Sequence, residues 1–354
     1  MADDSLPPDA GAPRAPGEPE TGADGDLGEK KAGPRIRRPP FELEGRAAPG
    51  LYAAGWVLST IGLAAAFVGL AASQPVTTPL LFGLGMMLLA LGLGSGAGSQ
   101  ALQRRADGVA RYAGPMPVLV FAAAATAGLG AQSLVILVVG PSGLPDAVAL
   151  AVSSGTMAVA AVAAVAILVV GAGALRWREM GLLRLDAGRG SAVTDLAWGV
   201  TLAVPTLFLA GAIAVVLVGL LGVMPEPVLP LSPDPAVLLV SLAVAGLVAP
   251  LWEELFFRGF ATTAWTRAVG PRAAIVRGAV FFALIHVLTI TGGDFGTAAR
   301  VALIAFCARL PVGFVLGWVF LRRRSLLAPI ALHATYNALP ILLYVATRSA
   351  LPAA

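Results

Sequence analysis

The sequence has few charged residues. Only 12% of its 354 residues are Asp, Glu, Lys or Arg, whereas 57% are hydrophobic. Soluble domains contain about 25% charged residues, and several apolar runs here exceed the roughly 18 residues that can span a bilayer. The short alternating segments that are typical of membrane β-barrels are missing. We therefore predict an all-α fold, a polytopic transmembrane helical bundle with eight or nine spans.

Cysteine and histidine are scarce as well. Cys307 is the single cysteine, so an intramolecular disulfide is excluded. The two histidines, His286 and His333, both fall inside apolar runs. The first thirty residues hold no apolar h-region, so we do not expect a secretory signal peptide. Basic residues lie beside the apolar runs, where the positive-inside rule explains them, and the net charge of +4 therefore does not indicate a nucleic-acid partner.

We expect three parts in the chain. Residues 1–47 are rich in Pro, Gly and acidic side chains and cannot bury a core, which predicts a disordered cytoplasmic tail. Residues 48–194 hold the N-terminal transmembrane helices and an interfacial helix at 175–194, with Trp177 and leucines facing lipid. Residues 195–354 form a C-terminal transmembrane core.

Nine apolar segments alternate with links of opposite charge. Arginines gather in every second link and acidic residues in the others, which is the pattern of the positive-inside rule. The pattern predicts a cytoplasmic N-terminus and an external C-terminus. The composition, rich in Ala, Gly and Arg, favours a bacterial plasma membrane. The segments are residues 51–73, 77–98, 116–139, 147–174, 195–224, 236–268, 272–291, 297–321 and 326–347.

One apolar run carries charges that need a reason. Residues 249–259 read A-P-L-W-E-E-L-F-F-R-G, and each charge at membrane depth costs about 2.5 to 3.5 kcal/mol on insertion scales. Glu254 and Arg258 are four residues apart, so they share a helix face and can pair. Glu253 lies about 100° around the helix and needs another partner. The charges either mark a helix end or belong to a site.

Both histidines are expected near this stretch. The segments on either side of residues 270–271 are antiparallel, and Glu254 precedes that turn by about as many residues as His286 follows it, so both lie at similar depth. Phe282 shares a face with His286 and would wall the site. His333 follows the next arginine cluster closely and shares a face with Asn337.

A carboxylate, two imidazoles and an amide in a wet membrane cavity suggest hydrolysis. A carboxylate can act as general base on water with a histidine as partner, and a His and an Asn can stabilise an oxyanion. The same groups could hold a metal ion through two histidines and a carboxylate. The H-E-x-x-H motif of the zincins is missing.

Three motifs in this order resemble a known family. E-E-L-F-F-R (253–258), F-A-L-I-H (282–286) and H-A-T-Y-N (333–337) are similar to the EExxxR, FxxxH and HxxxN/D motifs of the CAAX protease and bacteriocin-processing family, CPBP or Abi. The resemblance covers about residues 235–345. It implies an intramembrane protease with a core of about eight helices.

The resemblance also implies roles for the motif residues. Glu253 would be the general base that activates water, with His286 as its partner and Glu254 in support. Arg258 would pair with a carboxylate. The oxyanion-stabilising side would be formed by His333 and Asn337.

Two features of the expected site stay open. We expect no cofactor, with zinc as the alternative, held by His286, His333 and Glu253. Arg309 matches no motif of the family. Its depth resembles that of Glu254, so it is either a counter-ion, a clamp for a substrate carboxylate or a packing residue.

The sequence thus favours an intramembrane endopeptidase that cuts a peptide bond near the cytoplasmic face. Its partners would be the lipid membrane and a peptide or protein substrate, prenylated in the CAAX case. The main alternative is a non-proteolytic membrane scaffold or a bacteriocin-immunity-type protein. A proton-coupled transporter is less favoured, because no inverted repeat or pair of broken helices is evident.

Overall fold

The structure is a computed structural model, and it describes residues 42–139, 144–182, 192–225, 234–288, 290 and 293–350, with side chains up to residue 347. The predicted disordered tail lies outside this described part, except for residues 42–47. The proposed division of the membrane region at residue 194 stays a prediction. From residue 43 onward the chain forms one compact unit.

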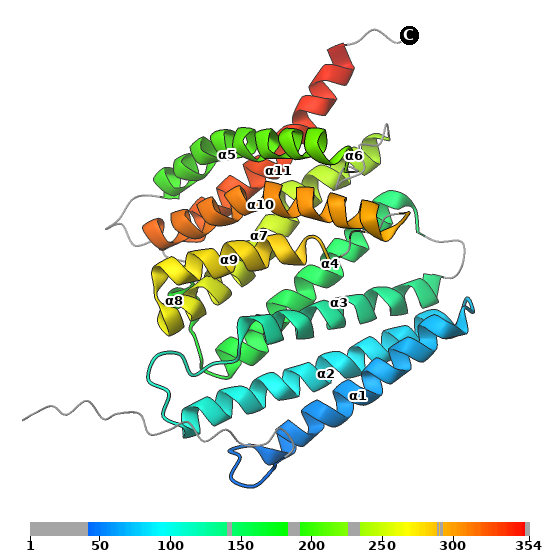
Figure 1. Cartoon of the computed structure of the whole chain (residues 1–354), viewed down its shortest axis with the longest axis vertical. Coiled ribbons are helices and arrows are strands. Elements are labelled where there is room, and N and C mark those ends of the chain that lie inside the picture. The colour runs from blue at the N-terminus through cyan, green and yellow to red at the C-terminus, as the bar shows by residue number, and fades with distance from the viewer. Residues whose placement is uncertain are drawn as a thin grey trace, which may run out of the picture. The chain divides into compact units, whose positions relative to one another are not determined.

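Helices make up most of the described chain, and no strand occurs within it. Figure 1 shows most of the long helices side by side. In chain order the elements are α1 (Pro49–Ala72), α2 (Thr77–Ala106), α3 (Pro117–Val139), α4 (Asp146–Val165), η1 (Ala166–Gly171), η2 (Trp177–Met180), α5 (Ala192–Leu221), α6 (Pro235–Ala243), η3 (Val244–Val248), α7 (Ala249–Glu254), η4 (Leu255–Thr262), α8 (Thr263–Val269), α9 (Pro271–Ile285), α10 (Phe295–Arg323) and α11 (Leu327–Ala350).

Eight stretches in the described residues are long and apolar enough to cross a membrane. The prediction of a polytopic helical bundle with eight or nine spans is confirmed. The ninth predicted segment, residues 272–291, differs from the expectation, because α9 ends at Ile285. Its 15 residues extend about 22 Å at 1.5 Å per residue, short of the roughly 30 Å of a hydrocarbon core. The helix ends directly before His286.

Glycines allow α1 and α2 to pack backbone against backbone. A Cβ on Gly62 would lie 2.5 Å from the backbone nitrogen of Leu89, and one on Gly85 would lie 2.5 Å from that of Ala66. In lipid the hydrophobic effect does not drive helices together, so their association relies on the close van der Waals contact that small residues allow. The first two spans therefore form a tight hairpin beside the rest of the bundle (Figure 1).

The arginine-rich links meet at one end of the bundle. An Arg105 amino group donates to the carbonyl of Ala172, Arg267 pairs with Glu179 at 2.8 Å, and Leu326 N donates to the carbonyl of Gly181. These contacts join the ends of α2 and α8 and the link that follows α10 to the stretch that follows η1, and the positive-inside pattern predicts that these parts share one side. Which side of a membrane this end faces stays a prediction.

The predicted interfacial helix differs from the structure. Within the described residues only Trp177–Met180 are helical, as one 3₁₀ turn that ends at Gly181 with φ +80°. Leu175 and Met180 are buried, and Trp177 packs against the core, so the expectation that Trp177 and the leucines face lipid is wrong for Leu175 and Trp177. The turn packs against η4. A Cβ added to Gly259 would lie only 3.2 Å from the carbonyl oxygen of Met180. Residues 183–191 lie outside the described part.

Candidate active site

The Glu pair lies on one continuous helical stretch with two π-helical parts. Residues Pro235–Val269 form a single candidate span, in which η3 precedes α7 and η4 follows it. A π-helix pairs residues five apart and is frequent at functional sites. In this wide register the carbonyl of Ala245 faces Pro250, which has no N–H to offer it. Asn337 Nδ2 donates to that carbonyl instead, at 3.2 Å.

The second wide turn begins directly after Glu254. All eight residues of η4 are buried, and the Thr262 hydroxyl donates to the carbonyl of Phe257, five residues back, at 2.8 Å. Phe256, Phe257 and Phe260 pack edge to face around this turn. The aromatic packing fixes the helix that carries the Glu pair in the centre of the core.

Glu254 is fully buried between two cationic or basic partners. Arg258 Nη1 lies 2.9 Å from Glu254 Oε1, so the predicted i,i+4 pair is confirmed. His333 Nδ1 lies 2.7 Å from the same oxygen, and because a carboxylate oxygen accepts, this ring nitrogen is assigned as the donor. The Arg258 guanidinium also stacks over the Phe282 ring at 4.4 Å.

Glu253 faces the other histidine. His286 Nε2 lies 3.6 Å from Glu253 Oε2, and His333 Nε2 lies 3.9 Å from it. His286 Nδ1 lies 2.7 Å from the carbonyl of Phe282, which can only accept, so Nδ1 is again assigned as the N–H. Neutral rings would therefore present both Nε2 lone pairs to Glu253 Oε2. Three acceptors converge on one small volume.

The three facing atoms, Glu253 Oε2 and the two Nε2 atoms, are not in direct hydrogen-bond contact. Both 3.6 and 3.9 Å are too long for a hydrogen bond, and within the described residues Glu253 Oε2 has no hydrogen-bond partner. A polar contact of this length raises the question of a bridging water. The His286 side chain is 23% exposed and that of Glu253 10% exposed, so this point is the accessible edge of the cluster. The arrangement offers one water molecule up to three acceptors.

The other expected residues surround this point. The Phe282 ring lies 4.4 Å from the His286 ring and 5.8 Å from the His333 ring, centroid to centroid, so Phe282 is the wall that the sequence predicts. One N–H of the Asn337 amide is used on Ala245, and the other has no partner within the described chain. Whether these side chains act in catalysis stays a prediction.

Arg309 lies at the level of this cluster. Gly313 approaches Ala279, and Gly317 approaches Ile275, so the antiparallel helices α9 and α10 bring Arg309 level with the residues just before His286. Its Nη1 donates to the carbonyl of Ala305 at 3.0 Å. Glu253 and Tyr336 are its electrostatic neighbours, and Tyr336 is a neighbour of the site that the sequence did not single out. The position of Tyr336 within the H-A-T-Y-N motif (333–337) is the sequence feature that could have indicated its place beside the site.

The described residues hold no group of three or more His, Cys, Asp or Glu side chains arranged to bind a metal ion. If a metal binds, the expected ligands are His286, His333 and Glu253, whose facing atoms are 3.6 and 3.9 Å apart. Ligands at about 2.0 to 2.2 Å from tetrahedral zinc would lie about 3.3 to 3.6 Å from each other, so a small closure of the site would be required.

The eight apolar spans of the described residues indicate an integral, multi-pass membrane protein. Residues 235–339 match the family model described as Rce1-like, type II CAAX prenyl endopeptidase Rce1-like. The match contains all three motifs, from Glu253 to Asn337, and the predicted resemblance to the CAAX protease family is confirmed over this part of the chain. The matched family is described as one of endopeptidases. No curated protein and no solved structure gave a match.

Proposed function

We propose that the protein is an intramembrane endopeptidase of the CAAX protease type, in which Glu253 activates a water molecule. The observation that carries the proposal is that the two carboxylates differ in their partners and in their exposure. Arg258 and His333 both contact Oε1 of Glu254, which is fully buried. Within the described residues Oε2 of each glutamate has no hydrogen-bond partner, but only Glu253 is partly exposed, with its Oε2 3.6 Å from His286. One carboxylate is structural, and the other is available as a base.

The reaction follows from these positions. A water molecule at Glu253 Oε2 gives a proton to the carboxylate as its oxygen attacks the scissile carbonyl, a general-base step worth about 10²- to 10⁴-fold. His286 orients the water and later relays the proton to the leaving amine. His333 would donate Nδ1–H to Glu254 and lie on the side of the oxyanion, where its Nε2 would become a donor only after taking up a proton during the reaction. The second N–H of Asn337 is the other candidate donor.

The site supports cleavage nearer the arginine-rich end of the bundle. His333 lies six residues into α11, about 9 Å from the start of that helix at 1.5 Å per residue, and the arginine-rich link precedes α11. If the N-terminus is cytoplasmic, this end is cytoplasmic too. The substrate would be a peptide or protein that reaches the membrane surface, and a prenylated C-terminus is the substrate type that the matched family's description names.

The proposal is tested by identifying the cleavage product of a model peptide. The purified protein in detergent is incubated with a farnesylated peptide that ends in a CAAX sequence, and with the same peptide without the lipid, and the products are identified by mass spectrometry. Release of the C-terminal tripeptide supports the proposal. Cleavage of both peptides at equal rates would remove the lipid requirement. Intact peptides with correctly folded protein would favour the scaffold alternative.

The metal question has its own test. Turnover that survives strong chelators supports direct activation of water by Glu253. Turnover that chelators stop and zinc restores would assign His286, His333 and Glu253 as ligands. In that case the metal would lower the pKa of the water, and the histidines would no longer act as proton carriers.

A further inference from the structure

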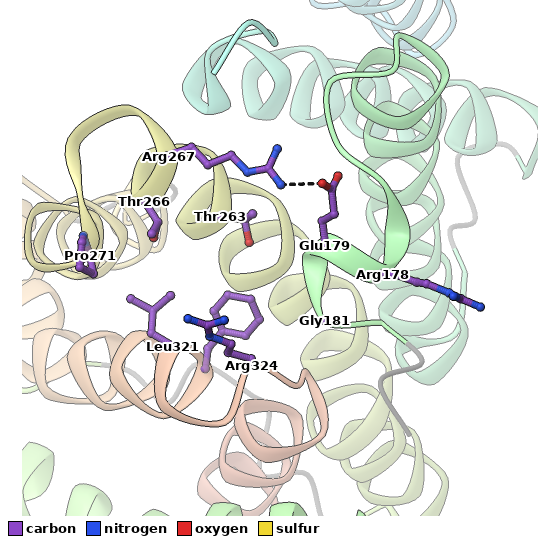
Figure 2. Close-up of a pocket in the computed structure, with 10 residues that line it drawn as sticks. Arg178, Glu179, Gly181, Thr263, Thr266, Arg267, Pro271, Leu321 and Arg324 are labelled. Carbon is purple, nitrogen blue, oxygen red and sulfur yellow. Dashed lines mark hydrogen bonds and ion pairs between the residues drawn. The ribbon is translucent and has the colours of Figure 1, made fainter. Parts of the chain in front are cut away.

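A second site lies away from the Glu pair, at the arginine-rich end of the bundle. It is a cavity of about 650 Å³, formed where η2, α8, the start of α9 and the end of α10 meet. Figure 2 shows Arg267 and Arg324 on different sides of it, with Arg178 pointing away. The lining residues are Arg178, Glu179, Gly181, Thr263, Thr266, Arg267, Pro271, Phe320, Leu321 and Arg324.

The charge of this cavity is positive, with three arginines and one glutamate. Glu179 is already occupied, because it pairs with Arg267 at 2.8 Å and accepts from the backbone N–H of Arg176 at 2.6 Å. Among the described residues, no carboxylate pairs with Arg324. The cavity therefore has a guanidinium to offer to an anion, and guanidinium groups bind phosphate through paired hydrogen bonds.

The backbone at Arg324 is held in an unusual conformation. Arg324 has φ +54° at the C-terminal end of α10, a position where glycine is the usual residue. Its N–H donates to Phe320 O at 2.6 Å, and two residues later Leu326 N donates to Gly181 O at 3.2 Å. The left-handed conformation is unfavourable for a residue that carries a Cβ. Arg324 adopts it and keeps its guanidinium at the cavity.

The remaining walls are apolar or hydroxylated. Phe320, Leu321 and Pro271 supply the apolar surface, and Thr263 and Thr266 supply hydroxyls (Figure 2). The Thr266 hydroxyl donates to Thr262 O, which leaves its oxygen as an acceptor. A cavity that combines arginines, hydroxyls and apolar side chains at the end of a membrane bundle fits a headgroup and the first carbons of a lipid, and basic pockets of this kind bind anionic headgroups.

We propose that this cavity binds the phosphate headgroup of an anionic phospholipid. Arg324 and Arg267 hold the phosphate, and Phe320 and Leu321 contact the glycerol and the start of the acyl chains. The bound lipid joins η2, α8 and α10, and η2 packs directly on η4 through Met180 and Gly259. This inference does not depend on the proposed peptidase activity.

The test compares two single-charge variants in the same arginine cluster. Arg324→Gly removes the cavity guanidinium and suits the left-handed backbone, whereas Arg322→Ala removes a nearby exposed arginine outside the cavity lining. Native mass spectrometry of detergent-purified protein, titrated with phosphatidylglycerol or phosphatidylcholine, measures the retained lipid. Arg324→Gly should bind phosphatidylglycerol about tenfold more weakly, as expected for one lost charged hydrogen bond, and Arg322→Ala should bind it as the unmodified chain does. Phosphatidylcholine should bind weakly to all three.

The outcomes separate the possible sources of phosphate. Retention of phosphatidylglycerol in the presence of millimolar inorganic phosphate supports a lipid site. Displacement by inorganic phosphate, with the same dependence on Arg324, would overturn the lipid and leave a site for a free anion. Equal losses in both variants would show only a general charge effect and overturn the site. Arg267→Gln is the second variant, so a folding defect in Arg324→Gly does not end the test.

Discussion

At the scale of single residues, the site depends on two neighbouring carboxylates with different partners. Glu254 shares one oxygen between Arg258 and His333, while Glu253 faces His286 across a gap. Adjacent residues on a helix point about 100° apart, so one helix can direct one carboxylate into the core and the other to an accessible edge. The spacing of the motifs indicated which residues meet. The spacing alone did not indicate which histidine meets which glutamate, because that depends on helix rotation. The family resemblance implied that Glu253 meets His286, and these two side chains face each other at 3.6 Å.

Replacement of Glu254 is predicted to affect stability more than chemistry. Glu254→Gln removes the charge that Arg258 and His333 share, and breaking a buried ion pair by removal of one partner costs about 3 to 5 kcal/mol. Thermal unfolding in detergent should therefore begin at clearly lower temperature. Asp107→Asn, the same change at an exposed helix end, is the control and should unfold as the unmodified chain does. Equal stability of both variants would contradict a buried pair at Glu254.

At the scale of elements, the fold is held by features that a pattern of apolar residues does not reveal. The sequence predicted the apolar segments, since length and hydropathy suffice for that. It did not predict the π-helical turns around the Glu pair, because they depend on Asn337 reaching Ala245 and on aromatic packing around η4. It also made α9 too long, since its apolar run continues beyond the point where the helix ends.

The α1–α2 contact gives a prediction at this scale. Gly62→Ala would place a Cβ 2.5 Å from the Leu89 nitrogen, a distance that requires the two helices to separate. The hairpin should lose stability, and its protease resistance in membranes should fall. Gly96→Ala, in the same hairpin but with nothing within 4 Å of the added Cβ, should be neutral or stabilising, because alanine favours the helix by about 1 kcal/mol. Equal behaviour of the two variants would contradict the packing described here.

The start of α10 should respond to pH. Asp294 caps this helix, with its side chain accepting from the Thr297 hydroxyl at 2.6 Å and from the Thr297 N–H at 3.0 Å. These bonds, the hydroxyl bond foremost, lower the pKa of the Asp294 carboxyl. A lowered pKa in the folded state adds stability above the unfolded pKa, and that stability is lost as the pH falls through the folded value.

Asp294→Ala therefore has a pH-dependent effect. Unfolding temperatures of the variant and the unmodified chain should differ most at neutral pH and converge below about pH 4, the ordinary range for an Asp carboxyl. A difference that stays constant from pH 7 to pH 3 would mean that the carboxylate charge does not contribute to the cap.

At the scale of the whole molecule, the arginine-rich links converge on one end of the bundle. The contacts between Arg267 and Glu179, and between Leu326 and Gly181, put links from distant parts of the sequence together. The charge alternation predicted this arrangement, because the positive-inside rule depends on composition alone. The cavity between the links was not predicted, since it needs the 3₁₀ turn at η2 to fold inward instead of lying on lipid.

The orientation of this end gives a prediction for cells. A reporter fused after Arg105 should be active on the cytoplasmic side, and one fused after Gly293 should be active on the outside, because the first site lies in an arginine-rich link and the second beside Asp294. A cytoplasmic signal from both sites would contradict the five crossings that the sequence predicts between them, the last of them over residues 272–291. Opposite signals with reversed sides would keep the fold and invert its orientation.

The measurement that tests the central claim most directly is the turnover of Glu253→Gln on a cleaved peptide. Glutamine keeps the shape and much of the hydrogen bonding but cannot take a proton from water, so turnover should fall about 10²- to 10⁴-fold with the protein still folded in the membrane. Asp107→Asn should retain full turnover. Full activity of Glu253→Gln would contradict the assignment of Glu253 as the base, and full activity of both Glu253→Gln and His286→Ala would contradict a hydrolytic site at this cluster.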